Sequence, residues 1–208
     1  MTDSFGVPQV LDYLAQMGLQ IASIDAVHEI VELAFHGNHG QWRMIISLQQ
    51  TCQTRKLVLI APHISAVTRK KRLACLEALM AVNYRIAMGK FGLDLDDGEV
   101  RLEESVPLAN NGVTFEQFQL VFRAMVQTVA MYHSLIPRIL YGNLSTQEAL
   151  LACEQEFFEG EELLEEDIDE EDVAESEVSS ETLQPLPELN VQDVMAEVHR
   201  LLEERKES

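Results

Sequence analysis

Cysteine is scarce in this sequence, and its distribution excludes a disulfide framework. The three cysteines, Cys52, Cys75 and Cys153, are far apart and odd in number. This pattern fits neither a set of disulfides nor a paired set of zinc ligands. We therefore predict free thiols.

Long apolar runs are also lacking. The best candidate, residues 115–141, contains Gln119, Arg123, Gln127 and His133, so it predicts a core helix and not a membrane span. The N-terminus lacks the basic patch and apolar run of an export signal. These absences predict a cytoplasmic protein without a membrane partner.

The motifs of common enzyme classes are missing too. The sequence has no phosphate loop, dinucleotide-binding glycine fingerprint, zinc-protease helix, nucleophile elbow or CxxC pair. We therefore expect a non-catalytic protein without a cofactor. An enzyme with an unrecognised site remains as an alternative.

Histidines offer one candidate metal set. His36 and His39 could ligate a metal together with His28 or His63. However, these two histidines are separated by Gly37 and Asn38, which is typical of a hairpin tip. The turn is the favoured interpretation, and no metal site is predicted.

Negative charge is present in excess but is confined to one part of the chain. The net charge is -20, yet residues 1–142 hold 12 Lys and Arg against 13 Asp and Glu, whereas residues 143–208 hold 3 against 22. Charge asymmetry of this kind indicates an appendage. The first part is a nearly neutral domain followed by an acidic extension.

The domain alternates single helices with runs of strands. Helical spacing of apolar residues predicts a helix at 8–19 and another from Thr68 onward, ending before Gly89. Between them, residues 27–67 predict three antiparallel strands. An α+β fold follows: helix, three-stranded antiparallel sheet, helix, two-stranded hairpin, long helix.

The hairpin and the long helix carry the clearest local signals. Asp97-Gly98, between alternating apolar residues, predicts a tight turn. Thr114 opens the long helix, which is predicted to end near Pro137 or Gly142. Residues 1–142 are therefore predicted to form the α+β domain.

Three further segments follow the domain. Residues 143–159 predict a short helical extension, and residues 160–189 an acidic disordered linker. Sixteen acidic residues lie between Glu148 and Glu181 with no Lys or Arg among them. Residues 190–206 predict a tethered amphipathic helix, whose candidate binding residues are Val194, Val198 and Leu201.

Apolar residues in excess of one core suggest a protein-binding surface. A central strand that is apolar on both sides implies that the second face of its sheet is partly covered. The candidate contact residues are Ile45, Val58 and Ile60 on the sheet, and Leu76, Met80 and Tyr84 if the second helix forms a dimer seam. Core packing is the alternative role for each.

One basic cluster precedes the second helix. Arg69, Lys70, Lys71 and Arg72 could contact an anion or the acidic tail. The alternative is a solvated helix start. Nucleic acid is not expected as a partner, because the domain is near neutral and no aromatic ladder accompanies the cluster.

A set of residues in the second half of the domain follows the pattern of a known family: Asn83, the stretch from Gly89 to Phe91, Asp94, Asp97-Gly98, Val100, Val106-Pro107 and the helix from Thr114. In these features the chain resembles the YbjN family. The resemblance spans about residues 5–142 and omits the tail.

The resemblance implies a bacterial protein with a fold similar to that of type III secretion chaperones. Those are small, cytoplasmic and usually dimeric, and they bind segments of other proteins without a nucleotide. The family carries no established catalytic residues. We therefore expect a chaperone-like or adaptor protein that binds a partner segment or forms a homodimer. The alternative is a signalling or regulatory protein that uses its terminal helix as a docking ligand.

Overall fold

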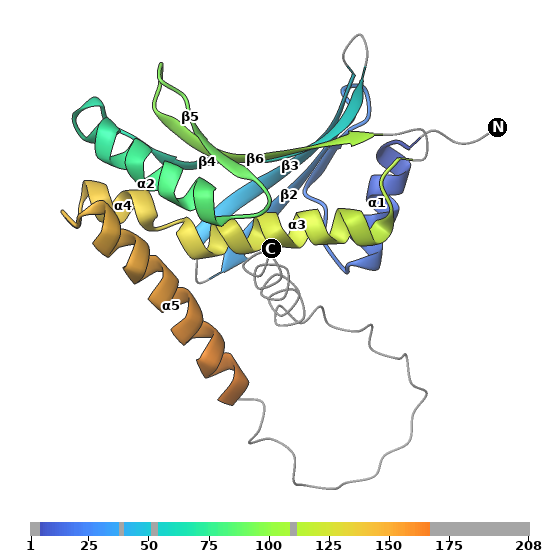
Figure 1. Cartoon of the computed structure of the whole chain (residues 1–208). Coiled ribbons are helices and arrows are strands. Elements are labelled where there is room, and N and C mark those ends of the chain that lie inside the picture. The colour runs from blue at the N-terminus through green and yellow to red at the C-terminus, as the bar shows by residue number, and fades with distance from the viewer. Residues whose placement is uncertain (1–4, 38–39, 51–53, 109–111, 167–208) are drawn as a thin grey trace, which may run out of the picture. The chain divides into compact units, whose positions relative to one another are not determined.

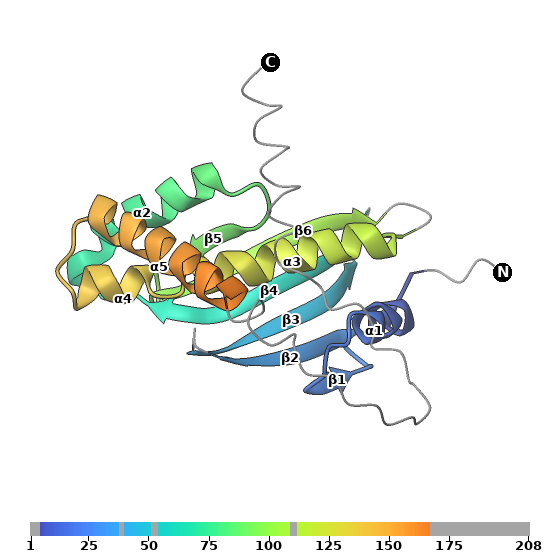
Figure 2. The same cartoon turned by 90° about the horizontal axis from the view of Figure 1, so that it is seen from below.

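The computed structural model describes residues 5–37, 40–50, 54–108 and 112–166. The chain divides into two compact units, residues 1–154 and 155–208. Of the described residues, the first unit holds all the strands and nearly all of the helices, which Figures 1 and 2 label. None of the helices in the described residues is long and apolar enough to cross a bilayer.

The strands form one antiparallel sheet of six, in the order β1-β2-β3-β4-β6-β5. Their bounds are β1 Ser23–Asp25, β2 Ile30–Gly37, β3 Gly40–Gln50, β4 Arg55–Ala66, β5 Lys90–Leu93 and β6 Glu99–Leu108. The antiparallel α+β class is confirmed. The division into a three-stranded sheet and a separate hairpin is wrong, because β6 pairs with β4 from Arg55 to Ala66. That pairing satisfies the backbone groups of an edge that β4 would otherwise expose.

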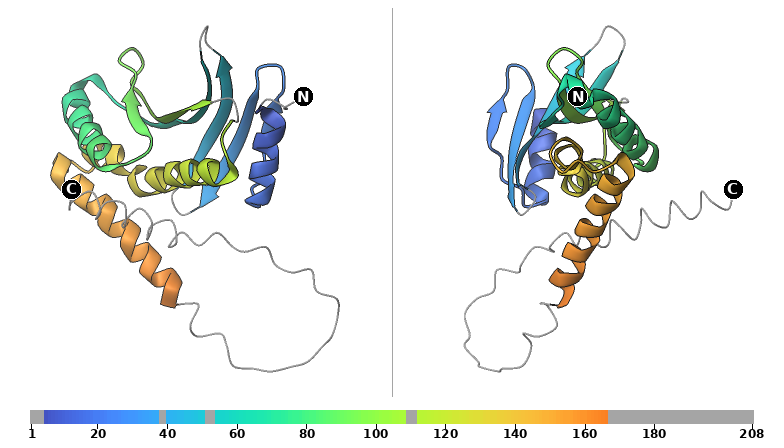
Figure 3. Two further views of the ribbon diagram at one scale, coloured as in Figure 1. Left: turned by 45° about the vertical axis from the view of Figure 1, so that its right-hand side comes forward. Right: turned by 90° about the vertical axis from the view of Figure 1, so that its left-hand side faces the viewer.

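Helices cover one face of this sheet (Figures 1 and 2). They are α1 Val7–Gln16, α2 Arg72–Arg85, α3 Phe115–Tyr132 and α4 Leu135–Leu140, with a short 3-10 turn at Arg69–Lys71 before α2. Figure 3 shows α1 beside β2 and β3, and α2 beside β5, toward opposite edges of the sheet. The hydrophobic core lies between the helices and this face.

Strand alternation assigns the residues to the two faces. In β3, Met44, Ile46 and Leu48 are buried in the core, while Ile45 between them is only half-buried. Leu57, Leu59 and Ala61 of β4 repeat the pattern. A period of two residues therefore selects the core side, as the pleat requires.

Helix α3 begins where the sequence predicts. Thr114 Oγ1 accepts a hydrogen bond from the Gln117 amide (3.3 Å), and Gln117 Oε1 accepts one from the Thr114 amide (3.1 Å). This reciprocal pair is a capping box. The helix ends at Tyr132, before the predicted end, and α4 follows. In a continuous helix, the ring of Pro137 would meet the carbonyl of His133, so the break comes one turn earlier.

Helix α5 spans Thr146–Glu166 and crosses the boundary between the two units. In the second unit, the rings of Phe157 and Phe158 meet edge to face with centroids 5.7 Å apart. The predicted terminal helix at residues 190–206 lies outside the described residues.

The turn at Gly98 yields a first prediction. Gly98 has φ +84°, and a Cβ there would lie 2.3 Å from the Val67 carbonyl oxygen. We expect Gly98→Ala to lower the free energy of unfolding by about 1–3 kcal/mol, measured by urea denaturation. Gly92→Ala is the control, because a Cβ at Gly92 meets nothing within 4 Å. Equal losses in the two variants would contradict the strained-turn explanation.

Candidate protein-binding site

The sheet face opposite the core carries a narrow strip of three apolar residues and one serine, here called the outer sheet face: Ile45, Ser47, Val58 and Ile60. The register pairs Ile45 with Ile60, and Ser47 with Val58. None of these four residues belongs to the core cluster. In the described part of the chain, no helix lies over this face (Figure 1).

Val58 is nevertheless fully buried, at 0% exposure. It lies in a central strand, with Ser47 and Ser105 opposite it on the two neighbouring strands. Ile45 and Ile60 remain half-buried. The outer sheet face thus offers a partner Ile45 and Ile60, while Val58 is covered by its neighbours.

Charged side chains border the strip. Arg43, two residues before Ile45, pairs at 2.8 Å with Glu32, which lies opposite Ile45 on β2. An exposed pair of this kind contributes roughly 0–1 kcal/mol. Its main consequence is to limit the apolar width of the outer sheet face.

Helix α2 leaves a longer apolar surface in solvent. Leu73, Leu76, Met80 and Tyr84, here called the α2 stripe, are 80%, 37%, 68% and 92% exposed. Their spacing of three, four and four residues puts them on one side of the helix. The opposite side carries the buried residues Cys75, Ala78, Leu79 and Val82.

The orientation of α2 is fixed at its last turn. The Asn83 side-chain amide donates to the Phe91 carbonyl (2.9 Å), and its oxygen accepts from the Phe91 amide (2.7 Å). Lys90 Nζ donates to the carbonyls of Asn83 (3.2 Å) and Ile86 (2.9 Å). These bonds tie the helix to β5 and hold the α2 stripe outward.

The predicted basic cluster separates into two roles. Lys71 Nζ donates to the Ile139 carbonyl (3.2 Å) and to Asn143 Oδ1 (3.4 Å), so it ties the start of α2 to the end of α4. Arg69 and Lys70 are exposed, and neither forms an ion pair within the described ranges. These two cations are available next to Leu73.

A polar cluster that was not predicted joins three helices. The Glu154 carboxylate of α5 accepts a hydrogen bond from the Tyr132 hydroxyl of α3 at 3.0 Å and forms an ion pair with Arg85 of α2. Burial, and then the charge of Glu154, raise the pKa of Tyr132. No local sequence pattern indicates this cluster, because its members lie far apart in the chain.

A cleft of about 410 Å³ lies beside this cluster, lined by Glu77, Arg85, Ser145, Thr146, Gln147 and Leu150. Ser145 and Glu148 form a capping box at the start of α5: the Ser145 amide and hydroxyl donate to the Glu148 carboxylate, and the Glu148 amide donates to Ser145 Oγ. Arg85 is paired with Glu154. These contacts give the polar lining residues a structural role.

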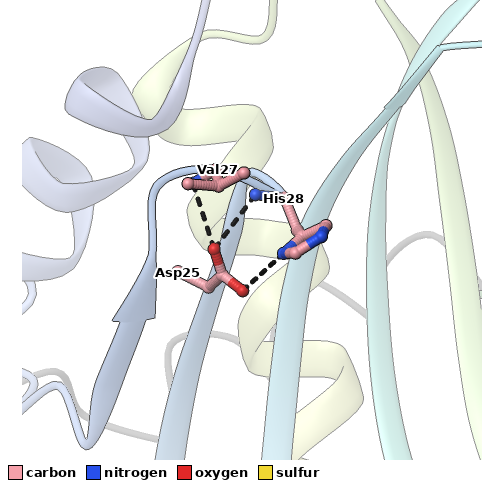
Figure 4. Close-up of polar contacts among 3 residues, drawn as sticks. All are labelled: Asp25, Val27 and His28. Atoms are coloured by element: carbon pink, nitrogen blue, oxygen red, sulfur yellow. Dashed lines mark hydrogen bonds and ion pairs between the residues drawn. The ribbon is translucent and has the colours of Figure 1, made fainter.

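Among the candidate metal ligands, His28 has a structural partner, while His39 lies outside the described residues. His28 and Asp25 lie in the turn between β1 and β2 (Figure 4): Asp25 Oδ1 accepts from the Val27 and His28 amides, both at 3.0 Å, and His28 Nδ1 lies 2.6 Å from Oδ2. The His28 side-chain hydrogen bond is the main cause of the lowered pKa of Asp25. Within the described residues, no group of three or more potential ligands could hold a metal.

Comparison with known proteins found one matching family model and similar solved structures. A family model described as "YbjN: Putative bacterial sensory transduction regulator" matches residues 8–136. A crystal structure described as "YbjN, a putative transcription regulator from E. coli" is 20% identical, covers 61% of this chain and 87% of that chain, and has a TM-score of 0.47. None of the curated proteins compared with the chain matches it.

The Tyr132 hydrogen bond yields a second prediction. Tyr132→Phe is expected to lower the free energy of unfolding by about 1 kcal/mol at neutral pH. Because the folded-state pKa of Tyr132 is raised, this tyrosine stabilises the fold fully below pH of about 10, and that contribution is lost as the pH rises further.

Urea denaturation over a series of alkaline pH values checks both effects. Stability should fall more steeply with pH in the unsubstituted protein than in Tyr132→Phe. Tyr141→Phe is the control, because Tyr141 is exposed. Parallel pH profiles for the protein and Tyr132→Phe would rule out the proposed role of the buried hydroxyl.

Proposed function

The chain belongs to the YbjN family, and from this premise we propose that it is a non-catalytic regulatory protein that acts by binding a segment of another protein. The family description, a sensory transduction regulator, supports a regulatory role. A chaperone-like or adaptor activity in the cytoplasm is the form of this role that the resemblance to type III secretion chaperones favours.

The α2 stripe is the observation that carries the proposal. Three of its four side chains are more than half exposed, although the rest of the helix packs into a well-formed core. Solvent-exposed apolar groups scattered singly are ordinary, but a contiguous row marks an interaction surface. The α2 stripe is therefore the leading site for a partner.

The outer sheet face is the second part of the proposed surface. Ile45 and Ile60 are accessible there, whereas Val58 is not. We assign it a smaller share of the binding free energy, because the buried apolar area sets the hydrophobic gain.

A second copy of the chain is an alternative occupant of the α2 stripe. A two-fold dimer would place Leu76, Met80 and Tyr84 of each copy in one seam, as a symmetric interface requires. Light scattering on the purified protein measures its molar mass and so distinguishes a monomer from a dimer. The molar mass of a monomer would exclude the dimer seam.

Exchange of exposed residues tests the binding surface. We expect Met80→Ser with Tyr84→Ser to reduce recovery of a protein partner from extracts of the source cells by about tenfold or more, because central apolar contacts contribute most binding energy. The control is Leu95→Ser with Leu151→Ser, which removes two exposed leucines outside α2. Quantitative mass spectrometry of the captured proteins is the measurement.

A second pair of substitutions compares the contributions of the outer sheet face and the α2 stripe to partner binding. Ile45→Thr with Ile60→Thr should reduce recovery less than the α2 variant does. If neither pair of substitutions changes the captured proteins while both variants remain folded, the proposed binding surface is wrong.

The tethered segment at residues 190–206 supports an alternative proposal, in which it is the docking ligand for another protein. Its sequence repeats apolar residues at helical spacing. Deleting 190–208 tests this while it keeps Glu154 and its partners. On this proposal the deletion, and equally Val194→Glu with Val198→Glu and Leu201→Glu, abolishes capture of the partner, whereas unchanged capture would exclude the segment as the ligand.

A further inference from the structure

We propose that the α2 stripe, together with the cations that precede it, binds an acidic amphipathic helix of another protein. This inference rests on the proposed function and specifies the chemistry of its partner. The shape of the stripe and the distribution of charge around it carry the argument separately.

The shape favours a helix. From Leu73 to Tyr84 the α2 stripe runs along one side of α2 for about 16 Å, at 1.5 Å per residue. A straight row of this kind packs against the row of residues three and four apart on a second helix. Helix-in-groove recognition uses the same spacing of apolar anchors.

The charge favours acidic residues in that helix. Arg69 and Lys70 precede the α2 stripe, and Lys90 lies at the other end of α2, where it donates to the carbonyls of Asn83 and Ile86. Glu77, the only acidic residue of α2, follows Leu73 by four residues and precedes Met80 by three, so it lies beside the middle of the α2 stripe and also lines the cleft with Ser145 and Thr146. The positive charge is therefore concentrated at the two ends of the stripe.

Two cations at the start of a helix oppose its macrodipole, because the N-terminus already carries partial positive charge. A third cation, Arg72, has a buried Nε without a hydrogen-bond partner. Carboxylates on a bound helix would offset this concentration of positive charge.

The same charges disfavour two other occupants. In a two-fold pairing of α2 with a second copy, Arg69 and Lys70 would meet either Lys90 or the equivalent cations of the copy, so like charges would face each other. An anionic membrane would attract the cluster, but residues 143–208 carry 22 acidic residues against 3 basic ones and would be repelled from it.

Binding of a synthetic peptide to the full-length protein tests the inference. The probe is a labelled amphipathic helix that repeats the spacing of the α2 stripe with leucines and carries glutamates at both ends, and its matched control carries lysines instead. We expect the acidic peptide to bind at least about tenfold more tightly in fluorescence anisotropy, with an affinity that falls as salt is added.

Variants of the protein separate the apolar contribution to peptide binding from the electrostatic one. Met80→Ser with Tyr84→Ser should abolish binding, and Arg69→Gln with Lys70→Gln should weaken it several-fold and reduce its salt dependence. Leu95→Ser with Leu151→Ser should leave it unchanged. All of these side chains are exposed, so the variants should retain the thermal unfolding midpoint of the parent.

Three results would overturn the inference. Equal affinity for the acidic and basic peptides would remove the role of charge. Binding to phosphatidylserine vesicles that depends on the α2 stripe, without peptide binding, would point to a membrane. A dimer that dissociates on Met80→Ser with Tyr84→Ser would identify a second copy as the occupant. The acidic peptide could also fail to bind while Met80→Ser with Tyr84→Ser still abolishes capture of a cellular partner. That result would overturn this inference and leave the proposed function standing.

Discussion

The pairing of β4 with β6 is the constraint on which the rest of the structure depends. It joins the first four strands to the β5–β6 hairpin, so that the helices of the core pack against one face of a single sheet. Because α2 connects β4 to β5, that pairing also determines where α2 lies. The exposed side of α2 is a consequence of this topology and of the small buried residues Cys75 and Ala78 beneath it.

Local signals in the sequence predicted the elements whose causes are local. The capping box at Thr114 and the turn at Asp97-Gly98 gave correct starting points, because each depends on residues that are neighbours in the chain. The short strand β1 was missed, since Ser23–Asp25 is exposed throughout and shows no alternation. The joined six-stranded sheet was also missed, because pairing between distant strands leaves no local pattern.

In the candidate site, too, local features could be predicted from the sequence and features set by the tertiary fold could not. The sequence identified Leu76, Met80 and Tyr84 correctly as members of one helical row, but spacing alone could not show which side of α2 would be buried. Likewise, four adjacent cations looked equivalent in the sequence. The structure assigns Lys71 to the carbonyl of Ile139, which only the tertiary fold could reveal. The role of each residue in partner binding remains a prediction.

The two hydrogen bonds of Asn83 have a thermodynamic consequence. A side-chain amide that both donates to and accepts from one residue of β5 restricts rotation of α2 about its own axis. Helix α2 is therefore preorganised, and on the proposed function its backbone would lose little conformational entropy when a partner binds the α2 stripe. Most of the ordering cost of association then falls on the incoming polypeptide, so affinity should depend strongly on how helical that polypeptide is before it binds.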